Sequence, residues 1–191
     1  WLGADAYEAM GAIGGSFVSD NIEDYYVNPF ELGYSFYIGW KSDFIGKDAL
    51  TAMKTAKNRK KVTFEWNAED VVKVIASAFQ PGQDHYKWID FPQPNYASTS
   101  ADMIMNGEKM VGMSMFNGFS YNERCMLSLG LVDADVAEGD VLTMKWGEPQ
   151  TTGKTSTEAH KQTEIRVRVS PTPYAREARE NYADSWRSKG L

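Results

Sequence analysis

Apolar and polar positions alternate most regularly in the last two thirds of the chain. KKVTFEW, residues 60–66, alternates apolar and polar side chains, and so does TEIRVRV, residues 163–169. The mostly apolar run CMLSLGLV, residues 125–132, carries no such alternation, and VLTMKW, residues 141–146, is another predicted strand. Strict alternation indicates a strand with one buried face, and short apolar runs bounded by turn residues indicate fully buried strands. The pattern therefore predicts a β-rich region from about residue 58 onward.

The pair Asn106-Gly107 lies between two further apolar segments, residues 101–105 and 108–116. Asn-Gly suits the type I′ turn that joins two antiparallel strands, because both of its central residues need a positive φ. We therefore expect residues 101–148 to form antiparallel strands with a two-residue turn at Asn106-Gly107, and no helix within residues 108–116.

Three segments have the periodicity of helices. Residues 68–79 follow Asn67, a good N-cap residue, and repeat apolar side chains on one helical face, namely Val71, Val74, Ile75 and Ala78. Residues 46–57 predict a short helix. The tail, residues 174–186, carries aromatic and small residues at four-residue steps and predicts a helix docked on the body.

The first third of the chain is rich in glycine and aromatic residues. ELGYSFYIGW contains many β-formers, which predicts a strand over about residues 32–40. Residues 80–100 contain several prolines and predict a long loop. The change of pattern places a domain boundary near residues 55–60.

Composition excludes several classes of function. The 191 residues carry a net charge of −6, which argues against a phosphate-driven nucleic-acid partner. No apolar run approaches the roughly 20 residues of a membrane span, so we expect no membrane association. Cys125 is the one cysteine, which rules out an intrachain disulfide and fits a reducing, cytoplasmic location. One cysteine and two histidines cannot build the usual zinc site, and we expect no metal.

The residues themselves show no recognisable catalytic set. The acidic run over residues 133–140 suits a solvated turn better than a cation site. Cys125 is expected to be a buried, inert thiol, and His85 has no nearby nucleophile or paired carboxylate in the sequence. Aromatic residues such as Phe119 and Tyr121 pack in cores more often than they stack on a flat ligand ring, and both alternatives stay open.

A resemblance to a known family extends this interpretation. NPFELGYSFYIGWKSDFIGKDAL, residues 28–50, resembles the signature of the folate-dependent aminomethyltransferases, the glycine-cleavage T-protein family. Residues 106–146, from the Asn-Gly pair through Gly139-Asp140 to the strand after it, resemble that family's C-terminal barrel. Residues 1–34 and SPTPYAREARENYADSWR, residues 170–187, are most similar to the tetrahydrofolate-dependent O-demethylases of vanillate and 3-O-methylgallate.

The resemblance implies an α+β fold in two parts. Residues 1–57 would be the end of a folate-binding middle domain, and residues 58–191 an antiparallel Greek-key-type β-barrel with a C-terminal helix. It implies tetrahydrofolate as cofactor and, as partners, a small-molecule methyl donor and a missing N-terminal part of the same enzyme. The chain starts at Trp1 rather than Met. We expect the catalytic residues upstream of Trp1, and the isolated chain to be inactive.

The resemblance also suggests which residues bind the cofactor. Barrel loops face the folate channel in the family, so Arg124 and Arg176 are candidates for the anionic glutamate tail and Tyr121 for a flat ring. An ordinary surface ion pair is the competing interpretation of both arginines. The implied activity is transfer of a methyl group from a methoxy-aromatic to tetrahydrofolate. Alternatives within the family are a glycine-cleavage aminomethyltransferase or a sulfonium demethylase; a non-enzymatic folate-binding or scaffold domain is the alternative from another class.

Overall fold

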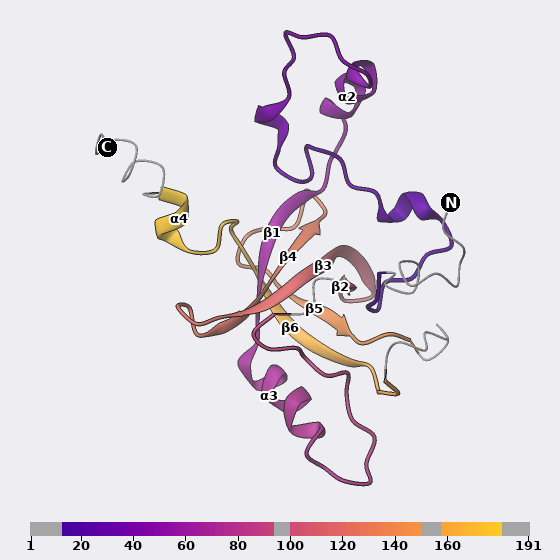
Figure 1. The fold of residues 1–191 in the computed structure, drawn as a ribbon, viewed down its shortest axis with the longest axis vertical. Helices are drawn as coiled ribbons and strands as arrows, with labels where there is room; N and C mark the ends of the chain where they lie inside the picture. The colour runs from indigo at the N-terminus through magenta and orange to yellow at the C-terminus, as the bar shows by residue number, and fades with distance from the viewer. Residues whose placement is uncertain (1–12, 94–99, 150–157, 181–191) are drawn as a thin grey trace.

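Six antiparallel strands close into a barrel in the computed structural model, which describes residues 13–93, 100–149 and 158–180 (Figure 1). Around the barrel the strands follow the order β1-β4-β3-β2-β5-β6, and β6 pairs back to β1. Their bounds are β1 Lys60–Trp66, β2 Ala101–Asn106, β3 Lys109–Ser120, β4 Cys125–Val132, β5 Val141–Trp146 and β6 Thr163–Ser170.

The strand order confirms the predicted Greek-key-type barrel. β2, β3 and β4 are consecutive neighbours, and β4 returns to lie beside β1, which a long connection joins to β2. The strands predicted at residues 60–66, 125–132, 141–146 and 163–169 are all present. Residues 109–116 belong to β3 and contain no helix.

Alternation along the strands decides which side chains fill the barrel. In β6, Ile165, Val167 and Val169 are at most 2% exposed, whereas the arginines between them face solvent. Three side chains inside the barrel satisfy one another's polar atoms: Trp66 Nε1 donates to Ser128 Oγ at 2.9 Å, and Ser114 Oγ donates to the same atom at 2.7 Å. The barrel is therefore a packed core rather than an open channel.

The β2–β3 hairpin is confirmed, but its turn is not the predicted one. Asn106 pairs with Lys109, so the two loop residues are Gly107 and Glu108. Gly107 has a φ of 59°, and Glu108 has no positive φ. A type I′ turn needs positive φ at both central residues, so that assignment is wrong. Only the first central residue of this turn needs a positive φ, and that residue is a glycine, which adopts it without steric cost.

The helix α3, Ala68–Ser77, lies against one end of the barrel (Figure 1). Asn67 Oδ1 accepts from the Asp70 backbone N–H at 3.1 Å, which confirms Asn67 as the N-cap. Val71 and Val74 are buried as expected, whereas Ala78 follows the last helical residue and is exposed. The Asp70 carboxylate accepts from both the backbone N–H and the guanidinium of Arg166, which ties α3 to β6.

The N-terminal part of the described chain departs from the prediction. Residues 32–40 form turns and the short 3₁₀ helix η2, Ser35–Tyr37, rather than a strand. The aromatic residues there have β propensity, but the closed barrel leaves no free strand edge to pair with them, and local i→i+3 and i→i+4 hydrogen bonds replace a ladder. The predicted helix at residues 46–57 is confirmed as α2, Lys47–Lys54, and another 3₁₀ helix, η1, spans Ile22–Tyr25.

The tail begins with the helix α4, Arg176–Glu180, none of whose residues is buried. Tyr182 and Trp186 lie outside the described residues, so the docking of the tail stays a prediction. The assignment of residues 1–57 to a folate-binding middle domain and of residues 58–191 to the barrel domain also stays a prediction.

Candidate functional site

The loop that joins β3 to β4 carries two of the three predicted cofactor-binding residues. Tyr121 is 71% exposed, and its ring meets Phe119 edge-on, with ring centroids 5.2 Å apart. Phe119 in turn contacts Phe91 at 5.8 Å. Phe119 packs against the core, and the more exposed rings of Phe91 and Tyr121 contact it, so Tyr121 offers a face on which a flat ring can stack.

Arg124 ends the same loop in a left-handed conformation, with φ of 59°. Its backbone N–H donates to Ser120 O at 2.7 Å and closes the loop. The Arg124 side chain is exposed, and no carboxylate in the described part of the chain forms an ion pair with it. Arg176, by contrast, pairs with Glu180 one helical turn later, with Nε and Oε2 2.7 Å apart. This exposed pair fits the competing interpretation of Arg176, whereas Arg124 has no such partner among the described residues, and the role of either arginine in binding a cofactor stays a prediction.

The tail and the β3–β4 loop meet beside these arginines. The Tyr174 hydroxyl donates to Glu65 Oε2 at 3.0 Å and lies within hydrogen-bonding reach of the Cys125 thiol. Burial, and after it the Glu65 carboxylate, raise the pKa of Cys125, so the thiol stays protonated and unreactive at neutral pH. Cys125 follows Arg124 and Tyr174 precedes Arg176 by two residues, so both arginines border one region, on the side where Figure 1 shows α4.

A buried polar seam between β2 and β5 is a second feature. These two strands pair at only two positions, Ile104 with Met144 and Met105 with Thr143. Beyond them Ser16 fills the gap: its hydroxyl donates to Lys145 O at 2.6 Å and accepts from Met103 N–H at 2.8 Å. One hydroxyl therefore replaces the missing ladder hydrogen bonds and binds the N-terminal segment to the barrel.

Two carboxylates hold the same segment by its backbone. Glu148 Oε1 accepts from Gly15 N–H at 2.7 Å, and Asp102 Oδ1 accepts from Ser16 N–H at 3.0 Å. Burial raises the pKa of Asp102 to about 6, although Lys87 and the Ser16 N–H act in the opposite direction. Burial also acts to raise the pKa of Glu148, but the Lys87 ammonium, 2.6 Å away, and the Gly15 N–H outweigh it and lower that pKa.

The other carboxylate oxygen of Glu148 faces a histidine. Glu148 Oε2 and His160 Nε2 are 3.4 Å apart, both side chains are 5% exposed, and neither atom has a hydrogen-bond partner among the described residues. His160 Nδ1 lies 2.7 Å from Glu158 O. Gly147, between β5 and Glu148, has φ of 102°, and a Cβ there would lie 2.9 Å from His160 Nε2. The close approach explains why a glycine occupies that position.

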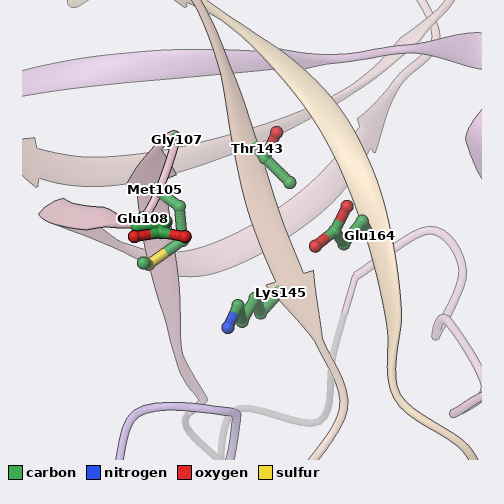
Figure 2. A pocket seen from close by; sticks show the side chains of 6 residues that line it. All are labelled: Met105, Gly107, Glu108, Thr143, Lys145 and Glu164. Carbon is green, nitrogen blue, oxygen red and sulfur yellow. The ribbon is translucent and has the colours of Figure 1, made fainter.

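A shallow pocket of about 440 Å³ lies on the outer wall of the barrel (Figure 2). Thr143 and Lys145 of β5 line it together with Glu164 of β6, and the β2–β3 hairpin contributes Met105, Gly107 and Glu108. One ammonium stands among two carboxylates there, an arrangement that suits a small polar or zwitterionic molecule. It contains no nucleophile with an adjacent base, so it carries no recognisable covalent chemistry.

Other candidate chemistry from the sequence resolves into structural roles. In the acidic run, Asp133 pairs with Lys109, Asp135 pairs with Lys57, and Asp140 accepts from the Ala137 N–H, as in a solvated turn. Within residues 13–93, 100–149 and 158–180, no three His, Cys, Asp or Glu side chains gather as a metal ion requires. None of the helices in those same ranges is long and apolar enough to cross a membrane.

The buried seam was not predicted from the sequence. Asp102 stands inside the apolar segment ADMIM, and a carboxylate in a predicted buried strand is a usable signal for a polar contact. Nothing in the sequence around Ser16 or Glu148 marks a buried polar contact. The groups that meet there are far apart in the chain: the Gly15 N–H and the Glu148 carboxylate are separated by 133 positions.

Comparison of the sequence with known proteins identifies relatives whose names suggest a function. No protein-family model matches the chain. The chain is 39% identical over 191 residues to syringate O-demethylase of a Sphingobium species, which covers 99% of this chain and 41% of that protein. It is 34% identical over 169 residues to sesamin methylene transferase of a Sinomonas species, covering 82% of the chain and 35% of that protein. The chain thus spans well under half the length of these curated relatives, both of which are named for the removal or transfer of a one-carbon group.

Proposed function

We propose that this chain is part of a tetrahydrofolate-dependent methyltransferase, and that the reaction is removal of a methyl group from a methoxy-aromatic compound. The observation that carries the proposal is similarity along 99% of the chain to a protein named as an O-demethylase. The exposed aromatic rings on the barrel, and an arginine that forms no ion pair with any described residue, support it, since these features suit a folate.

Tetrahydrofolate would supply the nucleophilic nitrogen that receives the methyl carbon. Among the described residues, Tyr121 offers an exposed ring face for the flat p-aminobenzoyl group, and Arg124 offers an exposed guanidinium for the glutamate carboxylates. In the transfer, the bond between the methyl carbon and the aryl oxygen would break as the bond to nitrogen forms, the aryl oxygen would leave as a phenoxide, and the proton displaced from the nitrogen would neutralise that phenoxide. The residues of this chain would position the tail rather than move the proton, because alignment of donor and acceptor is a major part of the barrier.

Transfer of a methylene group is the second candidate. It is favoured by the similarity to a protein named as a sesamin methylene transferase. The two candidates share the acceptor and differ in the donor, because a methylenedioxy ring loses a bridging carbon whereas a methoxy group loses a methyl. Isotopic labelling of the donated carbon therefore separates them.

The test uses a hybrid protein in which this chain replaces the matching region of the Sphingobium syringate O-demethylase. We expect the hybrid to move a ¹³C-methyl group from syringate to tetrahydrofolate, measured as labelled 5-methyltetrahydrofolate, and the 191-residue chain alone to give none above a heat-killed control. A folded hybrid that binds tetrahydrofolate but accepts neither methyl nor methylene carbon would contradict the proposal. Turnover by the chain alone would contradict the placement of the catalytic residues elsewhere.

A further inference from the structure

Residues 28–57, here called the aromatic lobe, stand away from the barrel (Figure 1). Glu31 is the lobe's only buried residue, and every apolar side chain in it is at least partly exposed. A segment that buries so little apolar surface gains little hydrophobic stabilisation of its own.

The inner side of the lobe is held by a few defined contacts. Trp40 stacks on Phe30 with centroids 6.4 Å apart, contacts Phe44 at 6.5 Å, and carries the Lys54 ammonium over its ring at 5.3 Å. At the base, Arg59 donates from Nε to Glu31 Oε1 at 2.7 Å and from Nη2 to Glu31 Oε2 at 3.2 Å. The lobe is therefore ordered and presents a defined outer surface.

Three other aromatic side chains of the lobe form an exposed cluster, and one of them, Tyr34, carries the Lys61 ammonium of β1 5.7 Å from its ring centroid. Tyr34 is 50% exposed, and Phe36 and Tyr37 are each 74% exposed. The Phe36 and Tyr37 rings lie 4.1 Å apart, and the Tyr34 and Tyr37 rings 6.1 Å apart. Ile45 in the same lobe is fully exposed. Single exposed apolar residues are ordinary on a protein surface, but contiguous aromatic clusters mark interaction surfaces.

We propose that Tyr34, Phe36 and Tyr37 form a docking surface for the part of the longer enzyme that this chain does not cover. This inference rests on the proposed function, which makes the chain one portion of such an enzyme. The occupant is polypeptide because the match spans only 41% and 35% of the two relatives, so more than half of each relative lies outside it and must pack somewhere. Its docking face would be apolar with hydrogen-bond acceptors for the two phenol hydroxyls, since buried tyrosines retain a polar partner.

Hydrogen exchange on the hybrid protein tests this surface. We expect the backbone amides of residues 34–45 to exchange at least about tenfold more slowly in the hybrid than in the chain alone, because docking excludes water from the lobe. The double substitution Phe36→Ser, Tyr37→Ser should remove that slowing. The matched control is Phe79→Ser, because Phe79 is 75% exposed and follows α3 rather than the lobe.

Several outcomes would overturn the docking surface. Exchange of residues 34–45 at equal rates in the hybrid and in the chain alone would do so, as would full slowing in the double variant. Slowing in the isolated chain that grows with its concentration would assign the surface to self-association instead. A hybrid that fails to fold is replaced by the chain mixed with the separately purified remainder of the relative, judged by the same rates. Methyl transfer to tetrahydrofolate is measured on the same hybrid. Slow amide exchange in the lobe without methyl transfer refutes the proposed function alone. Methyl transfer with fast amide exchange in the lobe refutes the docking surface alone.

Discussion

The substitution Ser16→Ala tests whether one hydroxyl closes the barrel between β2 and β5. The Ser16 side chain donates to Lys145 O at 2.6 Å and accepts from Met103 N–H at 2.8 Å. Alanine keeps the Cβ and leaves no large cavity, so the change isolates the two hydrogen bonds. It leaves the Met103 N–H on β2 and the Lys145 carbonyl oxygen on β5 without the hydrogen bonds that the Ser16 hydroxyl makes with them.

The expected cost follows from the burial of those two groups. A fully buried polar group that loses its partner costs about 1–3 kcal/mol. Ser16 is 2% exposed, but Met103 and Lys145 are only partly buried, so some water reaches the seam. We therefore expect the free energy of unfolding to fall by about 2–3 kcal/mol in total.

Urea denaturation followed by tryptophan fluorescence measures this change, because Trp66 and Trp146 lie in the core. For a slope of about 2 kcal/mol per molar urea, the midpoint should fall by about 1–1.5 M. The matched control is Ser35→Ala in the exposed helix η2, which should leave the free energy of unfolding within about 0.5 kcal/mol of the unsubstituted protein. An unchanged midpoint together with unchanged exchange of the Met103 amide would refute the role of Ser16 in closing the seam.

Three further predictions concern the seam and the cofactor tail. Relative to the unsubstituted protein, Asp102→Asn should gain stability as pH rises from 3.8, the ordinary pKa, through about 6. In that window the folded carboxyl keeps its proton while the unfolded one releases it, so the unsubstituted protein loses stability progressively, whereas the asparagine variant has no such loss. Urea midpoints of both proteins at several pH values check this, and a constant difference would count against it. Gly15→Ala should lower the free energy of unfolding by more than about 2 kcal/mol, since its Cβ would lie 2.3 Å from a backbone oxygen of β2 at φ of 95°; thermal unfolding without a loss would show that the segment moves aside freely. In the hybrid, Arg124→Ala should weaken tetrahydrofolate binding by about 1.5–3 kcal/mol and leave the binding of a folate analogue without glutamate unaffected. Arg176→Ala should change the affinity for neither ligand, as measured by calorimetry. If Arg124→Ala weakens the binding of both ligands equally, Arg124 has a structural role.

The sequence by itself determined the strands of the barrel. Alternation at residues 60–66 and 163–169 predicted β1 and β6 with the correct inward faces, because the two-residue period of a strand is a local property. The Asn67 cap likewise marked the start of α3, since capping involves residues only three positions apart. The closed Greek-key order came from the family resemblance, because periodicity identifies strands but not their neighbours.

Tertiary structure decided what local pattern cannot. Residues 32–40 have strand-forming composition yet form turns, because the barrel closes on itself and leaves no free strand edge to accept a ladder. The seam that binds Ser16, Asp102 and Glu148 joins backbone and side-chain groups 86 to 133 positions apart in the sequence. A hydrogen bond over that separation exists only once the chain has closed the barrel, so no local pattern of residues can encode its partner.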